Sequence, residues 1–177
     1  MKKINLKDVI RTVPHFPKHG VMFRDITTLL QNSSAFSFVV DELYERYQDA
    51  KVDVVAGIES RGFILGGALA YKLNKGFVPI RKKGKLPYET ESVEYELEYG
   101  KDKIEVHIDS IKKGDNVLLV DDLIATGGTA LAAAQLIEKL GGVVEECAFV
   151  IGLPDLKGIE KLKKKYGVFT LVDFEGE

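Results

Sequence analysis

The sequence predicts an α/β fold in which a parallel central sheet is covered by helices on both faces. Short apolar runs alternate along the chain with longer segments of helical periodicity, the pattern of parallel strands joined by helices. The run at 117–120 has four consecutive apolar residues, as a strand buried on both faces requires. With 177 residues, 45% hydrophobic and 29% charged, the chain is long enough for a single domain, 1–177, with a sizeable core.

The first half of the chain begins with a small N-terminal hood, residues 1–33. Asn5 can cap a helix at 6–13, which Pro14 ends, and an irregular segment with Pro and Gly follows at 14–25. The further expected elements are a helix at about 34–48, a strand at 52–58, a helix at 61–73 and a strand at 77–80.

A charged excursion at 81–109 then interrupts the alternation. Two alternating stretches within 95–107 flank Gly100-Lys101-Asp102, which predicts an exposed hairpin with these three residues between its strands. Long excursions beside a ligand-binding sheet are often lids, so we expect 81–109 to be a flexible lid. A surface hairpin without a role would show the same pattern.

The alternation resumes after the excursion. The expected elements are a strand at 116–121, a helix at 130–140, a strand at 143–153, a charged helix at 158–166 and a last strand at 168–174. Ligands of such folds bind at the carboxyl ends of the strands.

The segment Val117 to Ala130, VLLVDDLIATGGTA, joins a buried strand to two carboxylates and a Gly-rich turn. The stretch Ala125-Thr126-Gly127-Gly128-Thr129 lies where the strand ends and the helix begins. Free backbone N–H groups and the helix dipole there favour a phosphate. The segment therefore predicts a site for a phosphorylated sugar.

Asp121 and Asp122 have no structural reason to follow a buried strand, and carboxylates so placed bind a cation or hydroxyl groups. Adjacent strand residues point to opposite faces, so the two are expected to have different roles. Asp122 is expected to be a loop carboxylate whose removal lowers turnover and leaves the fold intact. In the structural alternative, Asp122 only begins a loop and Thr126 only caps the helix.

Composition disfavours several classes of function. The formal net charge is −2, from 25 basic and 27 acidic residues, so no overall positive field indicates a nucleic-acid partner. No apolar run approaches the roughly 20 residues of a membrane span. The lone Cys147 lies in an apolar run, which is typical of a buried strand thiol. We expect a cytoplasmic protein with small phosphorylated ligands and without nucleic-acid or membrane partners.

The segment 117–130 resembles the phosphoribosyl diphosphate (PRPP) binding motif of the type I phosphoribosyltransferases. That motif has a hydrophobic strand, two acidic residues and a loop of small residues, Thr and Gly. Other phosphate signatures, GxxxxGK[ST] and a GxGxxG after a strand, are absent from the sequence. The resemblance implies the type I phosphoribosyltransferase fold, with PRPP as co-substrate and Mg²⁺ as cofactor.

Four further segments are similar to successive blocks of the adenine phosphoribosyltransferase family. They are FPKHGVMFRDIT at 16–27, VVAGIESRGFILG at 54–66, PIRKKGKLP at 79–87 and YELEYGKDKIEVH at 95–107. The similarity covers nearly the whole chain, including LKGIEKL at 156–162. It implies that adenine and PRPP give AMP and diphosphate, in purine salvage, and that the protein is a homodimer.

The residues and the resemblance together nominate a site. Arg61, opening a helix after a buried strand, and the cations that follow the next strand suit a diphosphate, and Phe23 can stack on a purine. The expected PRPP-binding residues are Ser60, Arg61, Arg81, Lys85, Asp121, Asp122, Ala125, Thr126, Gly127, Gly128 and Thr129; the adenine-binding residues are Met22, Phe23 and Arg24. The expected catalytic residues are Glu94, Tyr95, Asp121, Asp122 and Arg61. Asp121 and Asp122 would bind Mg²⁺ largely indirectly, because PRPP would hold most of its shell.

The resemblance also assigns the lid and one peptide bond. Glu94 and Tyr95 resemble the family's lid dipeptide, so Glu94 would be a general acid at the purine and Tyr95 would help to close the site. A cis peptide is implied between Glu59 and Ser60.

Alternatives stay open at both levels. Structurally, the cations after 80 could be a solvated charge run, Ser60 a helix cap and Phe23 a core anchor. Functionally, the same fold could carry a xanthine or hypoxanthine-guanine phosphoribosyltransferase, or a PRPP-sensing regulator that binds nucleic acid.

Overall fold

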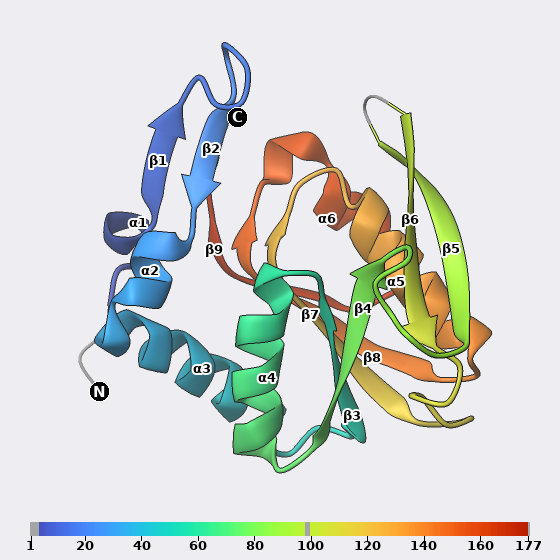
Figure 1. The fold of residues 1–177 in the computed structure, drawn as a ribbon. Coiled ribbons are helices and arrows are strands. Elements are labelled where there is room, and N and C mark those ends of the chain that lie inside the picture. The colour runs from blue at the N-terminus through green and yellow to red at the C-terminus, as the bar shows by residue number, and fades with distance from the viewer. Residues whose placement is uncertain (1–3, 98–99, 177) are drawn as a thin grey trace.

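A computed structural model describes residues 4–97 and 100–176. A seven-stranded sheet forms its centre, with strands β3 Val54–Ile58, β4 Gly76–Lys82, β5 Thr90–Leu97, β6 Gly100–His107, β7 Asn116–Ile124, β8 Val143–Gly152 and β9 Val168–Asp173. Their order across the sheet is β5-β6-β4-β3-β7-β8-β9 (Figure 1). The last five strands of this order are parallel, and β5 and β6 form an antiparallel hairpin at one edge. The predicted α/β class is confirmed, with a mixed rather than fully parallel sheet.

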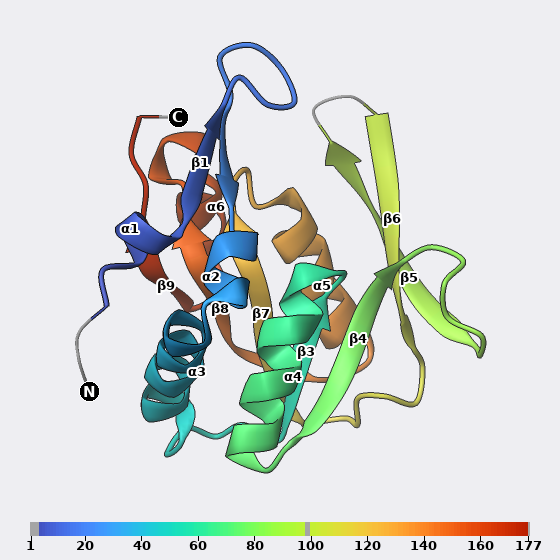
Figure 2. The same ribbon diagram turned by 60° about the vertical axis from the view of Figure 1, so that its left-hand side comes forward.

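Helices cover both faces of this sheet, as predicted. Helices α3 (Ser33–Tyr47) and α4 (Arg61–Leu73) lie on one face, and α5 (Gly128–Lys139) and α6 (Gly158–Lys163) on the other (Figure 2). Alternate residues of β7 enter the two cores: Leu118 packs with the α3 and α4 side, and Leu119 with the α5 side. Strand β7, like its neighbour β3, is therefore buried on both faces, which explains the apolar runs of these two strands.

The N-terminal hood differs from the expectation. It contains α1 Leu6–Val9, β1 Arg11–Pro14, β2 Met22–Asp25 and α2 Thr27–Gln31. The helix expected at 6–13 ends at Val9, and part of the segment expected to be irregular is β2, which pairs antiparallel with β1. Asn5 does cap α1, by accepting a hydrogen bond from the Lys7 N–H. The hairpin is stabilised by the Arg11 guanidinium on Asp25 across the strands, a contact that helical periodicity does not reveal.

The excursion is a hairpin, but its boundaries also differ from the prediction. Gly100, Lys101 and Asp102 belong to β6, where Asp102 pairs with Tyr95, and residues 98–99 lie outside the described residues. The base of the hairpin is not exposed, since Ile104 and Val106 are buried in the core. The hairpin continues the sheet because Arg81 and Lys82 of β4 pair with β6.

Strand β7 is longer than expected. It continues to Ile124 because β8 pairs alongside it as far as Gly152, so Asp121 and Asp122 lie within the strand. Asp122 is 3% exposed. The expectation of a loop carboxylate is therefore wrong for Asp122. No helix in residues 4–97 and 100–176 is long and apolar enough to cross a membrane.

Candidate active site

A cavity of about 330 Å³ lies where β7 meets α5. Gly127 is the N-cap of α5 and has a φ of +74°, a left-handed conformation that favours glycine. Having no side chain, Gly127 leaves the first N–H groups of the helix available to an anion. Each of the five predicted phosphate-binding residues, Ala125, Thr126, Gly127, Gly128 and Thr129, lines this cavity.

The two aspartates have different surroundings. Asp121 lines the cavity, and its Oδ1 accepts a hydrogen bond from the Asp122 N–H at 2.9 Å. Burial, followed by the charge of Asp122, raises the pKa of Asp121 well above its ordinary value. The Asp122 carboxylate instead accepts a hydrogen bond from Arg61 Nε at 2.5 Å. An acid with a raised pKa at the end of a parallel strand is typical of a functional site.

Glu59 gathers the predicted diphosphate-binding cations. Its carboxylate, 10% exposed, accepts hydrogen bonds from Lys85 Nζ at 2.5 Å, Arg81 Nε at 3.2 Å and the Lys82 N–H at 3.1 Å. Burial alone would raise the pKa of Glu59, but these bonds outweigh it and lower the pKa to about 2. The peptide between Glu59 and Ser60 is cis, as implied by the resemblance. Ser60 lies at the N-cap position of α4 without a capping side-chain bond.

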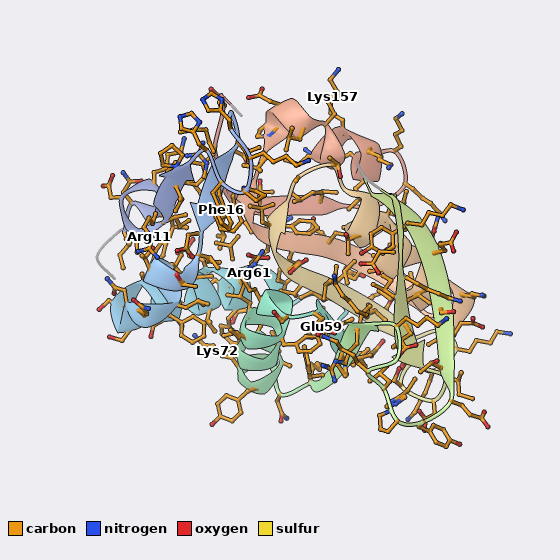
Figure 3. The ribbon with its side chains drawn as sticks, turned by 45° about the horizontal axis from the view of Figure 1, so that its top comes forward. Arg11, Phe16, Glu59, Arg61, Lys72 and Lys157 are labelled. Carbon is orange, nitrogen blue, oxygen red and sulfur yellow. The ribbon has the colours of Figure 1, made fainter. Side chains whose placement is uncertain are left out.

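A second cavity, of about 390 Å³, lies between the hood and the start of α4. Its wall includes Phe16, Phe23, Arg24, Thr27 and Arg61, and the two phenylalanine rings meet edge to face at 5.2 Å. Figure 3 shows Arg61 between Phe16 of the hood and Glu59 in that view. Arg24 stacks on Phe174 at 4.5 Å, so its side chain is directed to the C-terminal segment. An aromatic wall beside a guanidinium is suited to a flat heterocycle.

The two residues predicted to act in a lid, Glu94 and Tyr95, lie in different surroundings. Tyr95 lines the first cavity, and its hydroxyl lies 3.4 Å from Asp102 Oδ2. Glu94 lies outside that lining; its side chain is 56% exposed and pairs with Lys101 at 2.8 Å. That hydrogen bond lowers the pKa of Glu94, whereas a general acid at neutral pH needs a raised one.

The structure thus brings together some predicted residues and not others. Asp121, Tyr95 and Ala125 to Thr129 share the first cavity, and Phe23, Arg24 and Arg61 share the second. Neither lining includes Ser60, Arg81, Lys85, Asp122, Met22 or Glu94. The first cavity adds residues that were not predicted, Glu59, Lys82 and Asp102. Strand alternation was the available signal for Lys82, because it shares a face of β4 with Ile80, which also lines the cavity.

Gly158 packs against the turn at 125–129, which is predicted to bind phosphate. Its N–H donates to the Ala125 carbonyl at 3.0 Å, and a Cβ at this position would lie 2.1 Å from that oxygen and 2.6 Å from the Gly127 nitrogen. The start of α6 therefore fixes the turn through a contact that only glycine allows.

Gly158→Ala should displace the turn and lower kcat/KM for PRPP on the order of 100-fold, because small misplacements of binding groups are expensive. Gly67→Ala is the matched control, since a Cβ there would meet nothing within 4 Å. Steady-state kinetics and thermal melting of both variants check this. Unchanged PRPP kinetics in a folded Gly158→Ala protein would contradict the role of the contact.

Comparison with known proteins identifies the family. The model of the phosphoribosyl transferase domain matches residues 26–176. The adenine phosphoribosyltransferase of Chlorobium luteolum is 62% identical over 175 residues, covering 97% of this chain and 99% of the relative. The chain belongs to the adenine phosphoribosyltransferase family.

Solved members of the adenine phosphoribosyltransferase family have the same fold. The Thermoanaerobacter pseudethanolicus structure aligns with a TM-score of 0.91 at 48% identity, covering 95% of this chain and 97% of that one. The Saccharomyces cerevisiae structure, solved with an imino-altritol bisphosphate and adenine, aligns with a TM-score of 0.88 at 43% identity, covering 94% and 96%. These relatives favour the adenine family over the xanthine, hypoxanthine-guanine and regulatory alternatives.

Proposed function

We propose that this protein is an enzyme that transfers the 5-phosphoribosyl group of PRPP to adenine, forming AMP and diphosphate in purine salvage. The observation that carries the proposal is a pair of cavities, one lined by the Gly-rich turn at 125–129 and one with an aromatic wall, linked by the bond of Arg61 to Asp122. The family membership supports the same reaction. It is a pentosyltransferase reaction, so the enzyme must hold adenine beside the ribose carbon of PRPP at which the transfer occurs.

The first cavity is the proposed site of the ribose 5-phosphate. The backbone N–H groups of Ala125 to Thr129 would bind the phosphate at the start of α5. Asp121 would accept hydrogen bonds from the ribose hydroxyls, and Asp122 would act through Arg61, to which it is bonded. Such fixed contacts place the ribose for attack.

Arg81, near the end of β4, and Lys85, in the loop that follows β4, form the proposed diphosphate site. Arg81 and Lys85 already converge on one carboxylate, so a second anion nearby would meet two preplaced positive charges. Ser60 and Arg61, which follow Glu59, complete this set. Charge that develops on the leaving diphosphate would be neutralised by these groups.

The carboxylate of Asp121 fits a magnesium ion, because hard cations prefer oxygen ligands. Among the described residues, no group of three or more His, Cys, Asp or Glu side chains could hold a metal ion by itself. We therefore propose that the diphosphate of PRPP supplies most of the ligands and that Asp121 and Asp122 contribute indirectly. When bound, Mg²⁺ would neutralise charge on the diphosphate.

The second cavity is the proposed adenine site. Phe23 would stack on the purine, and backbone groups of Met22, Phe23 and Arg24 would bond its Watson–Crick edge. Adenine presents an acceptor at N1 and a donor at N6, so one N–H and one C=O can select it over guanine or hypoxanthine. Glycosyl transfer passes through an oxocarbenium-like state, so the closed site must also exclude water, a role proposed for Tyr95 and the lid at 81–109.

Incubation with PRPP, Mg²⁺ and each nucleobase in turn tests the proposed function. Adenine should give AMP and diphosphate, while guanine, hypoxanthine, xanthine and orotate should react far more slowly. No AMP from adenine, or faster turnover of another base, would overturn the proposal. Binding of DNA or RNA without base turnover would favour the regulator.

Glu94→Gln should lower kcat with little effect on PRPP affinity if Glu94 is the general acid, because its proton would serve only the base. Its ion pair with Lys101 would have to open first. The chain offers a matched variant, Glu98→Gln, in the second Glu-Tyr pair of the segment 94–99. Loss of kcat in Glu98→Gln with none in Glu94→Gln would contradict the role of Glu94.

Organisation and location complete the proposal. We propose that 1–177 acts as one domain with a hood at 1–33, and that two copies form a homodimer. The exposed apolar side chains of Ile64 and Tyr71 on α4, 48% and 89% exposed, support self-association. Light scattering in solution measures the mass and tests the dimer. A cytoplasmic location accords with PRPP as substrate, because such a highly charged molecule does not cross membranes unaided.

A further inference from the structure

Glu105 is a buried acid to which the roles above assign nothing. It lies in β6, directly opposite Arg81 of β4 in the strand register, and is 5% exposed. A buried carboxylate is costly unless hydrogen bonds satisfy it. Its partners therefore indicate why the chain retains an acid at this position.

Those partners belong to the loop that joins β4 to β5. One oxygen, Oε1, accepts hydrogen bonds from three successive backbone N–H groups, of Gly84 at 2.9 Å, Lys85 at 3.2 Å and Leu86 at 3.3 Å. The other oxygen lies 3.5 Å from the Thr90 hydroxyl. Three consecutive N–H groups around one anion form a nest, so the carboxylate fixes the path of this loop.

The same loop determines where two cations lie. The Lys85 carbonyl accepts a hydrogen bond from Arg81 Nη1 at 3.1 Å, and Lys85 Nζ reaches Glu59 at 2.5 Å. Arg81 bonds the same Glu59 carboxylate through Nε at 3.2 Å. Glu59 lines the first cavity, so a loop held by Glu105 brings both positive charges into contact with a residue of the cavity wall.

We infer that Glu105 is a positioning residue for diphosphate binding: it holds the backbone of Gly84 to Leu86 so that Lys85 and Arg81 present their charges together. The inference rests on the proposed function, in which these cations bind the diphosphate of PRPP. Glu105 itself touches the loop and not the ligand. Its removal should therefore weaken diphosphate selectively and leave the phosphate-binding turn and the adenine site intact.

Titration calorimetry of Glu105→Gln with inorganic diphosphate plus Mg²⁺, and separately with AMP, tests this. The dissociation constant for diphosphate should rise about tenfold or more, and that for AMP should stay within about twofold, because AMP uses the two cavities and not the cations. Glu105→Asp shortens the side chain by one carbon. It should also raise the dissociation constant for diphosphate selectively, by a smaller factor than Glu105→Gln. Glu91→Gln is the control, since that hairpin carboxylate pairs with Lys139 of α5.

A second background shows whether Glu105 acts through the cations. In Lys85→Ala, the Glu105→Gln change should lose most of its effect on diphosphate, because the charge that it positions is gone. Equal effects in both backgrounds, or equal weakening of AMP and diphosphate, would overturn the inference. So would unchanged diphosphate binding in Lys85→Ala while the wild type forms AMP, a result that leaves the proposed function standing.

Discussion

Replacing Arg61 with Ala should destabilise the protein more than replacing Asp122, although the two form one ion pair. Asp122 is 3% exposed, whereas 48% of the Arg61 side chain is exposed. Arg61→Ala leaves a buried carboxylate without its partner, which typically costs about 3 to 5 kcal/mol. Asp122→Ala leaves a guanidinium that can turn to water, so a loss of about 1 to 2 kcal/mol is expected. Both variants should lose kcat/KM about 100-fold, because Arg61→Ala removes the guanidinium from the wall of the second cavity and Asp122→Ala removes the carboxylate that holds it in place.

Urea denaturation of the two variants and of Arg61→Ala/Asp122→Asn measures this asymmetry. The double variant removes the stranded charge while keeping the shape of the carboxylate, so it should be more stable than Arg61→Ala alone. Equal stability losses in the single variants, or no recovery in the double variant, would show that the ion pair does not carry the difference.

Asp121→Asn should lower activity as the Arg61 and Asp122 variants do, but it should raise the stability of the protein. The amide cannot bind ribose hydroxyls or a magnesium shell as a carboxylate does, so kcat should fall about 100-fold. In the wild type, burial and then the charge of Asp122 disfavour the charged form of Asp121. An amide carries no such charge, so the substitution should raise the free energy of unfolding by about 1 kcal/mol at neutral pH.

The raised pKa of Asp121 determines how the stability of the wild type depends on pH. The pKa of Asp121 is raised in the folded state above its unfolded value near 4, so the folded state binds the proton more tightly. The free energy of unfolding of the wild type therefore falls as the pH rises from the pKa of Asp121 in the unfolded state through its raised pKa in the folded state. Asp121→Asn removes this fall. Urea denaturation at pH 4.5 and pH 8 should show the stabilisation growing with pH. A variant that is less stable at pH 8, or as active as the wild type, would contradict the assignment.

Local sequence was enough to predict the parallel strands and the Gly-rich turn before α5. The strand predicted at 52–58 is found at 54–58, and the helix is found at 61–73 as predicted, because apolar runs and helical periodicity are local signals. The turn at 125–129 likewise needs only its neighbours in sequence. The hood could not be predicted in this way, because β1 and β2 are short and depend on pairing with each other.

The side-chain contacts of the site were also beyond local sequence. Glu59 meets Lys85, 26 positions along the chain, through the β3–β4 pairing and the loop that follows β4. Glu105 meets Gly84 through the pairing of β4 with β6. A sequence pattern gives the residue types of such a site, whereas the register of distant strands decides which of them meet.

In the proposed function, the place of Arg61 would link the binding of the two substrates thermodynamically. The guanidinium is part of the wall of the second cavity, and its bond to Asp122 joins it to the residue next to Asp121 in the first. A ligand in one cavity that shifts Arg61 would change the free energy of binding in the other cavity. Reciprocity then requires that the factor by which PRPP alters the affinity for adenine equals the factor by which adenine alters the affinity for PRPP.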